Sequence, residues 1–321
     1  MGAARSRADT APMTRFVLTA LAAALLAAPA AASAADTTIA ADPAAQRVAA
    51  LDGNVVWVSG KFGRQSLMTV DAPGATPHAV PGVPEARSYQ SIDLGRDVEG
   101  RLVLTYLQCS SGDRCVALRD DLGGHHAGIK GLRPKGCTWS AAPAIWRARM
   151  AYGLYCNSKK RGGLFVKKVG SPARRLPLPK DAVKYDSRLI SYVDLRGTRV
   201  AAVAADIYEY AFSQTVNGSG MSSIFVAASE GESDEHVRGL SLGNGATMWV
   251  LVDSLHVGDP NQAVIFRGRT QETLANPPAA VDDTYRATGL AVDGDDVYIV
   301  APQTGIVRHD FTADPPSRAA R

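Results

Sequence analysis

A serine motif is the one stretch of this sequence whose spacing resembles that of a catalytic nucleophile. It reads Gly239-Leu240-Ser241-Leu242-Gly243. In hydrolases with this pattern the serine lies on a sharp turn between a strand and a helix, and the turn exposes its hydroxyl for attack. Here Ser241 is followed by Gly243-Asn244-Gly245 and by a strand-like run at 248–252, so the helix is missing. We therefore predict no catalytic residue from this motif.

The histidines and one aspartate-rich turn are the remaining groups that could hold a metal ion. The six histidines are scattered along the chain, and none makes a metal-site spacing with a carboxylate. Asp293, Asp295 and Asp296 surround Gly294, but the longer calcium-loop pattern is absent and a hairpin turn accounts for them. The sequence therefore predicts neither a metal nor any other cofactor.

Arginine beside an aromatic residue or a histidine recurs along the chain and gives the main candidate for ligand binding. The eight residues are Arg87 with Tyr89, Tyr185 with Arg188, His236 with Arg238, and Tyr285 with Arg286. A guanidinium beside an aromatic ring suits carboxylate or phosphate recognition combined with stacking. We therefore predict an anionic ligand site built from these residues. Salt bridges between neighbouring repeats are an equally supported role for the arginines.

Four cysteines predict two disulfides, because the beginning of the chain indicates export. Cys109 and Cys115 flank a short polar turn between two apolar runs, as cross-strand partners in a hairpin do. Cys137 and Cys156 lie at nearly equal distances on either side of a second turn, at Trp146-Arg147. Antiparallel pairing would bring each pair together, and the bridges would contribute about 2 and about 3 kcal/mol. The alternative, a metal site, lacks both Cys-x-x-Cys and a histidine at zinc-like spacing.

Residues 1–34 have the pattern of an export signal. Three arginines precede an apolar run at 16–28, and Ala32-Ser33-Ala34 forms a small-residue cleavage site. Cleavage there would leave a mature chain that is secreted or located in the periplasm or cell envelope, with Met13 as an alternative start. The apolar run is too short for a membrane anchor, and no later run reaches the ~18 residues that a spanning helix needs. We expect no membrane span.

Composition and charge are those of an ordinary globular protein. Apolar residues make up 46% and charged residues 21% of the chain. The formal charge of +4 falls to +2 when three arginines and one aspartate leave with residues 1–34. No basic patch that would indicate nucleic-acid binding survives this processing. We expect a monomer whose partner is a protein or an anionic glycan, and no nucleic-acid partner.

A unit of about 48 residues recurs six times and must position the residues named above. In each copy two strand-like runs flank a tight turn, which contains Asp-Gly or Asn-Gly in three copies. These dipeptides are strong hairpin signals because such turns need positive φ. The turn residues are Gly53, Gly100, Arg147, Gly197, Gly245 and Gly294, at spacings of 47, 47, 50, 48 and 49 residues.

A third strand-like run follows each turn and a weaker fourth follows most of them, which predicts an all-β, six-bladed β-propeller of four-stranded antiparallel blades. The last copy ends near Phe311 without a fourth strand, and a spare strand at 37–40 could complete it and close the ring. The fourth copy is irregular. We expect its third strand at 224–226, its fourth strand missing or merged with 235–240, and a long loop at 208–212.

This repeat pattern resembles the TolB-like class of exported bacterial six-bladed propellers. The resemblance covers residues 37–311 and rests on the period and on segments such as Leu290-Ala291-Val292-Asp293-Gly294-Asp295-Asp296-Val297-Tyr298. The Ser-Pro-Asp-Gly turn common in TolB repeats is absent, so the resemblance implies architecture and carries over no site residue. The expected organisation is a signal peptide at 1–34, a single propeller at 35–314 and a disordered tail at 315–321.

In a propeller the inner strands begin at one face, and the arginine and aromatic residues precede those strands, at the mouth of the central channel. Trp139 takes this place in the third copy. We predict an exported binding or scaffold module for a protein or an anionic cell-envelope ligand at this face. The alternative is a lactonase-like hydrolase or a lyase on the same fold. Metal-dependent propeller hydrolases need several acidic or amide residues on inner strands, and only Asp93 and Asp194 clearly qualify.

Overall fold

The chain divides into two units, Met1–Ala35 and Asp36–Arg321. The computed structural model describes residues of the second unit: 36–111, 114–157, 162–186, 189–206, 208–228, 236–254, 262–268, 270–274, 287–301, 304–309 and 311. The predicted export signal and the predicted tail lie outside the described residues. Within the described part, no helix has the length and hydropathy needed to cross a membrane.

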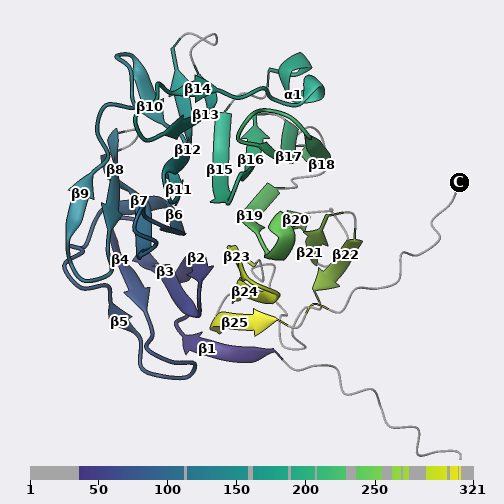
Figure 1. Cartoon of the computed structure of the whole chain (residues 1–321). Helices are drawn as coiled ribbons and strands as arrows, with labels where there is room; N and C mark the ends of the chain where they lie inside the picture. Colours follow the sequence, from purple (N-terminus) through teal and green to yellow (C-terminus); the bar gives the residue numbers. More distant parts are fainter. Residues whose placement is uncertain are drawn as a thin grey trace, which may run out of the picture. The chain divides into compact units, whose positions relative to one another are not determined.

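The second unit is a ring of six antiparallel blades, as predicted (Figure 1). Blade 1 contains β2 (Ala45–Leu51), β3 (Asn54–Lys61), β4 (Arg64–Thr69) and β5 (His78–Ala79). Blade 2 contains β6 (Ser88–Arg96), β7 (Leu102–Ser111), β8 (Arg114–Asp120) and β9 (His126–Gly128). Blade 3 contains β10 (Cys137–Trp139), β11 (Ala144–Trp146), β12 (Arg149–Cys156), β13 (Gly163–Lys168) and β14 (Arg174–Arg175).

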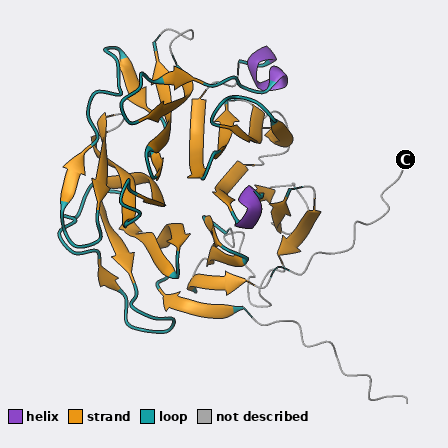
Figure 2. Cartoon of the chain, viewed as in Figure 1, coloured by secondary structure: helices purple, strands orange, loops and turns teal. Residues whose placement is uncertain are grey.

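The second half of the ring repeats this order, and the described helices are short (Figure 2). Blade 4 contains β15 (Leu189–Arg196), β16 (Arg199–Ala205), β17 (Tyr208–Thr215) and β18 (Ser222–Ala228). Blade 5 contains β19 (His236–Leu242), β20 (Met248–Ser254), β21 (Gln262–Arg267) and β22 (Thr270–Leu274). Blade 6 contains β23 (Leu290–Asp293), β24 (Asp296–Ala301), β25 (Gly305–His309) and β1 (Thr37–Ala41). Helix α1 (Lys180–Lys184) precedes blade 4, and a 3-10 turn, η1 (Asn244–Ala246), lies inside blade 5.

The ring closes through β1. This strand pairs antiparallel with β25, from Thr37 opposite Arg308 to Ala41 opposite Gly305. Ile39 and Ala40 of β1 are buried. The predicted closure by a strand from the beginning of the chain is therefore confirmed, and it covers an otherwise open sheet edge.

Apolar side chains hold neighbouring blades together. The inner strands contact one another in the order β2, β6, β11, β15, β19, β23 and back to β2. Six apolar clusters occur among the described residues, one at each interface between blades. Trp57, at the interface of blades 1 and 6, is fully buried and donates its indole N–H to Asp42 Oδ2 at 2.7 Å. Burial of these surfaces is the main driving force for the ring.

The turn residues that recur about every 48 residues in the sequence form the hairpin turns between the first and second strands of the blades. Gly53 has φ of 75°, a conformation that favours glycine. Arg147 adopts φ of 53° at the equivalent place in blade 3, where the sequence signal was weakest. A non-glycine residue there is compatible with the turn at the cost of some strain. The hairpin geometry is thus kept although the glycine is lost.

The prediction for the fourth copy was wrong by one strand. Residues 224–226 belong to β18, the fourth strand of blade 4, and the segment predicted as a loop is part of the third strand, β17. Residues 236–240 of the segment predicted to merge with the fourth strand are instead in β19, the inner strand of blade 5. β16 and β17 follow each other after a very short connection, whereas a longer one separates β17 from β18. The sequence therefore suggested a third strand further along the chain, beyond β17.

Candidate functional site

Two faces of the ring are distinguished by strand direction. The loop face carries the ends at which the inner strands begin and the connections between second and third strands of each blade. The turn face carries the hairpin turns between first and second strands. The residues predicted to bind a ligand precede or begin inner strands, so they belong to the loop face.

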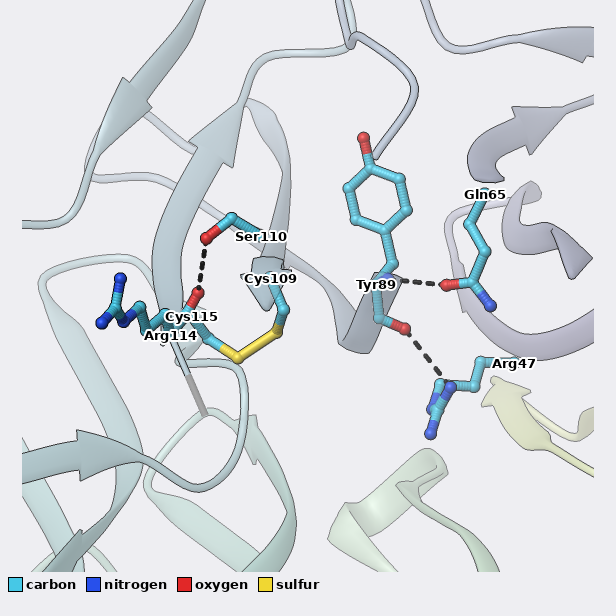
Figure 3. Close-up of a disulfide and its surroundings, with 7 residues drawn as sticks. All are labelled: Arg47, Gln65, Tyr89, Cys109, Ser110, Arg114 and Cys115. Atoms are coloured by element: carbon cyan, nitrogen blue, oxygen red, sulfur yellow. Dashed lines mark hydrogen bonds between the residues drawn. A yellow bond between two sulfur atoms is a disulfide. The ribbon is translucent and has the colours of Figure 1, made fainter. Parts of the chain in front are cut away.

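Both predicted disulfides are present, and both stiffen the loop face. Cys109 and Cys115 join β7 to β8 across their hairpin (Figure 3). Cys137 and Cys156 join β10 to β12. All four cysteines are buried in the apolar cluster between blades 2 and 3. The bridges therefore constrain two of the three blades that frame the cavity described next.

A cavity of about 680 Å³, the loop-face pocket, lies among blades 2, 3 and 4. Its lining includes Gln90 of blade 2, Tyr155 and Asn157 of blade 3, and Asp186 and Asp206 at blade 4. This volume falls in the usual range of roughly 300–1,000 Å³ for small-molecule sites. The size and position make it a candidate binding site.

The lining of the loop-face pocket combines an aromatic surface with hydrogen-bonding groups. The Tyr155 side chain is 56% exposed. Trp139 is mostly buried and packs edge-on against Tyr152, with 5.7 Å between ring centroids. Ser140 Oγ is buried and has no hydrogen-bond partner within the described structure. Among the described lining residues there is no lysine or arginine, and the charged ones are Asp186 and Asp206.

A β-bulge interrupts four inner strands close to the loop face. The extra residues are Gln46 in β2, Gln90 in β6, Ser191 in β15 and Arg238 in β19. Bulges redirect side chains and are frequent beside functional sites. Gln90 thereby lines the loop-face pocket, and Arg238 lines the central cavity. The repeat pattern carries no signal for these bulges, because an extra residue leaves the turn spacing nearly unchanged.

Tyr89 does not have the predicted stacking role. Its ring is fully buried, its hydroxyl donates a hydrogen bond to the Pro84 carbonyl, and burial raises its pKa. Figure 3 shows its backbone held between two side chains: Tyr89 N–H donates to Gln65 Oε1 at 2.7 Å, and Arg47 Nη1 donates to the Tyr89 carbonyl at 3.3 Å. A buried tyrosine with these bonds is part of the blade 1–blade 2 core.

Arg87 and Tyr185 are exposed and have other neighbours. The Arg87 guanidinium lies 5.1 Å from the centre of the Phe62 ring. Tyr185 is the C-cap residue of helix α1, and its ring lies 4.8 Å from that of Tyr208. Tyr185 also directly precedes Asp186, a lining residue of the loop-face pocket. Of these two predicted residues, Tyr185 is therefore the one next to a cavity.

His236 contributes to the contact between blades 4 and 5. Its Nδ1 lies 3.4 Å from Glu209 Oε1, and the Val237 N–H donates to Glu209 Oε2 at 2.7 Å. Arg238 lines the central cavity instead of the loop-face pocket. The remaining predicted residues, Arg188, Tyr285 and Arg286, lie outside the described residues. The described members of the predicted set thus have separate surroundings and form no single cluster.

The central cavity is small and is crossed by a buried polar network. It measures about 40 Å³, little more than the roughly 30 Å³ that one water molecule occupies. Asp194 Oδ2 accepts from the Leu242 N–H at 2.6 Å and from Ser241 Oγ at 3.3 Å. Ser241 Oγ in turn accepts from the Val292 N–H at 3.1 Å. Ser241 therefore connects inner strands.

Arg196 and Asp93 complete this network. Arg196 Nη2 donates to the carbonyls of Ala50 at 3.2 Å and Val292 at 2.9 Å, so it joins blades 1, 4 and 6. Asp93 Oδ2 is buried without a hydrogen-bond partner within the described structure. Burial and the neighbouring Asp194 raise the pKa of Asp93 well above its ordinary value, and Arg196 opposes this rise. The network holds inner strands together, and its cavity is too small for a substrate.

Comparisons with known proteins find distant structural similarities and no family. No family model and no curated protein matches the chain. Virginiamycin B lyase from Staphylococcus aureus is 12% identical, with 85% of this chain and 97% of that chain covered and a TM-score of 0.46. The fungal lectin of Aleuria aurantia, a six-bladed β-propeller, is 9% identical, with coverages of 85% and 98% and a TM-score of 0.48. A protein of unknown function from Dyadobacter fermentans is 9% identical, with coverages of 86% and 97% and a TM-score of 0.49.

Proposed function

We propose that this protein is an exported, non-catalytic binding module that holds a glycan in the loop-face pocket. The observation that carries the proposal is the pocket itself: about 680 Å³ beside an exposed tyrosine, with carboxylate, amide and hydroxyl groups around it. Such a mixture of aromatic surface and few polar groups is typical of small-molecule sites. The two disulfides and the signal-like pattern at 1–34 support export.

The lining matches the chemistry of a sugar. The apolar C–H face of a sugar ring can pack on Tyr155, and sugar hydroxyls can donate to the carboxylate of Asp206. The side-chain amides of Gln90 and Asn157 offer both donors and acceptors to the same hydroxyls. Because the disulfides stiffen the surrounding hairpins, little ordering is needed on binding.

An anionic glycan would need a cation beyond the described lining. Arg188 is placed for this role by the sequence alone, because it lies between Asp186 and Leu189, which both line the pocket. We therefore keep Arg188 from the predicted ligand site as the residue that would extend binding to acidic sugars. Neutral sugars are the class that the described groups favour.

Binding is better supported than hydrolysis or a lyase reaction. Of the two acidic residues that the sequence offered on inner strands, Asp93 faces a cavity of about 40 Å³. The other, Asp194, is engaged by a backbone N–H and by Ser241. Neither carboxylate stands in the larger loop-face pocket.

The test is a titration of the purified protein with neutral and acidic oligosaccharides by calorimetry. We expect a neutral oligosaccharide to bind, and Tyr155→Ala to weaken this binding about tenfold through the loss of about 1.4 kcal/mol of stacking. Phe62→Ala, which removes another exposed aromatic ring outside the pocket, is the matched control and should change nothing. Absence of binding to any oligosaccharide, or equal losses in both variants, would contradict the proposal.

A further inference from the structure

We infer a second binding site, on the turn face between blades 2 and 3, for an anionic amphiphile with one acyl chain and a carboxylate or phosphate head group. This turn-face pocket has a volume of about 230 Å³. It is lined by the first hairpin turns of both blades and by the ends of β8 and β13. None of its lining residues belongs to the loop-face pocket.

The floor of the turn-face pocket is apolar. Leu132 and Ile145 are buried there, and Ile129 and Met150 are half-buried. At its mouth Val98 and Val169 are 53% and 67% exposed, although both are hydrophobic. Apolar side chains that stay exposed or half-exposed around one cavity mark a surface whose contact with water is unfavourable and is relieved when a ligand covers it.

The rim of the same pocket is cationic. Five cationic residues line it: Arg119, Lys130, Arg147, Arg149 and Lys167. Within the part of the chain that the structure describes, none of these five side chains has an ion-pair partner. The one acidic lining residue, Asp97, is held by Arg101, with 2.6 Å between Arg101 Nη2 and Asp97 Oδ2. Elsewhere Arg64, Arg96 and Arg267 do have carboxylate partners.

Five positive charges around one cavity repel one another, and an anion at the rim relieves that repulsion. Arg119, Arg149 and Lys167 come from three different strand ends or turns, so the charges converge through the fold and are not a run in the sequence. Guanidinium groups suit the paired oxygens of a carboxylate or phosphate. The charged rim therefore selects an anionic head group.

The apolar floor selects what is attached to that head group. Inorganic phosphate would leave the floor uncovered, and a neutral hydrocarbon would leave the five charges unmatched. One acyl chain with an acidic end satisfies both parts of the site. Because each buried methylene is favourable, binding should strengthen about fourfold per methylene until the floor is covered. The small volume limits the occupant to a single chain.

The test is a calorimetric titration of the whole protein with hexyl, octyl and decyl phosphate, each kept monomeric, with inorganic phosphate and decyltrimethylammonium as comparison probes. We expect saturable binding of one alkyl phosphate, stronger with chain length and weaker with added salt. Decyltrimethylammonium and inorganic phosphate should bind at least tenfold more weakly. The Tyr155→Ala variant should bind alkyl phosphate like the wild type, since Tyr155 lines the loop-face pocket and not the turn-face pocket.

Matched charge variants locate the site. R119Q together with K167Q removes two rim charges and should weaken decyl phosphate binding at least tenfold. R114Q together with K168Q removes the same charge from the same two strands, β8 and β13, at residues outside the pocket, and should change affinity less than twofold. Equal effects of the two double variants would overturn the inference. Binding only to anionic vesicles and not to monomeric alkyl phosphate would also overturn it, in favour of a membrane-surface role.

Discussion

At the scale of single residues, buried polar groups at the ring axis connect the blades through hydrogen bonds. Asp194, Ser241 and Arg196 bond backbone groups of strands that are far apart in the sequence. A buried charge is costly unless it is paired or hydrogen-bonded, so each of these groups depends on its neighbours. Within the described structure, Arg196 Nε and Asp93 Oδ2 are buried without a hydrogen-bond partner. Burial and the neighbouring Asp194 raise the pKa of Asp93.

The raised pKa of Asp93 makes a pH dependence testable. Burial and Asp194 raise this pKa well above the ordinary carboxyl value. Between the ordinary and the raised pKa, the folded protein holds a proton on Asp93 that the unfolded chain has released. The contribution of this group to stability is therefore present at low pH and is lost as pH rises through that window. Asp93→Asn removes the titrating carboxyl and therefore this pH-dependent loss of stability.

Urea unfolding of wild type and Asp93→Asn across pH 4 to 8 measures this effect. We expect the variant to gain stability relative to the wild type as pH rises from the ordinary carboxyl pKa of about 4. Asp181→Asn, at an exposed residue in the first turn of helix α1, is the control and should show no such trend. A difference between Asp93→Asn and wild type that is constant with pH would show that Asp93 is ionised in the fold.

At the scale of elements, the sequence predicts those features that arise between residues close together in the chain. Turn residues at fixed spacing indicated six blades, because a hairpin turn needs positive φ wherever it occurs. Both disulfides could be assigned because each joins strands within one blade. β17 was missed because its connection to β16 is very short. The two pockets could not be predicted, since residues such as Gln90, Tyr155 and Asp206 meet only when whole blades pack together.

Strand β1 closes the ring by pairing with β25, so the stability of the fold should depend on this strand. Ile39→Asn places a polar amide in the buried side of β1, and we expect a loss of stability of about 3 kcal/mol or more. Thr38→Asn, the neighbouring exposed residue of the same strand, is the matched control and should cost less than about 0.5 kcal/mol. Denaturant unfolding compares the two. Equal stabilities of the two variants would show that β1 is not needed to close the ring.

At the scale of the whole molecule, the two proposed ligand sites differ in character. The loop-face pocket lies among blades 2, 3 and 4, and its described lining contains carboxylates and amides without a cation. The turn-face pocket lies between blades 2 and 3 and carries five cations around an apolar floor. Both use blade 3, and the disulfides brace the loop face of blades 2 and 3. A rigid ring can thus offer separate sites for different ligands.

Hydrogen exchange of the protein with and without a bound neutral oligosaccharide tests the central claim most directly, because it reports where a ligand slows local opening. If the loop-face pocket is the glycan site, exchange slows in β10 and at the end of β12, around Tyr155, and is unchanged in β1 and β25. Protection confined to blades 5 and 6, or to the turn face around Val98 and Arg149, would contradict the claim, because the glycan would then bind elsewhere on the ring.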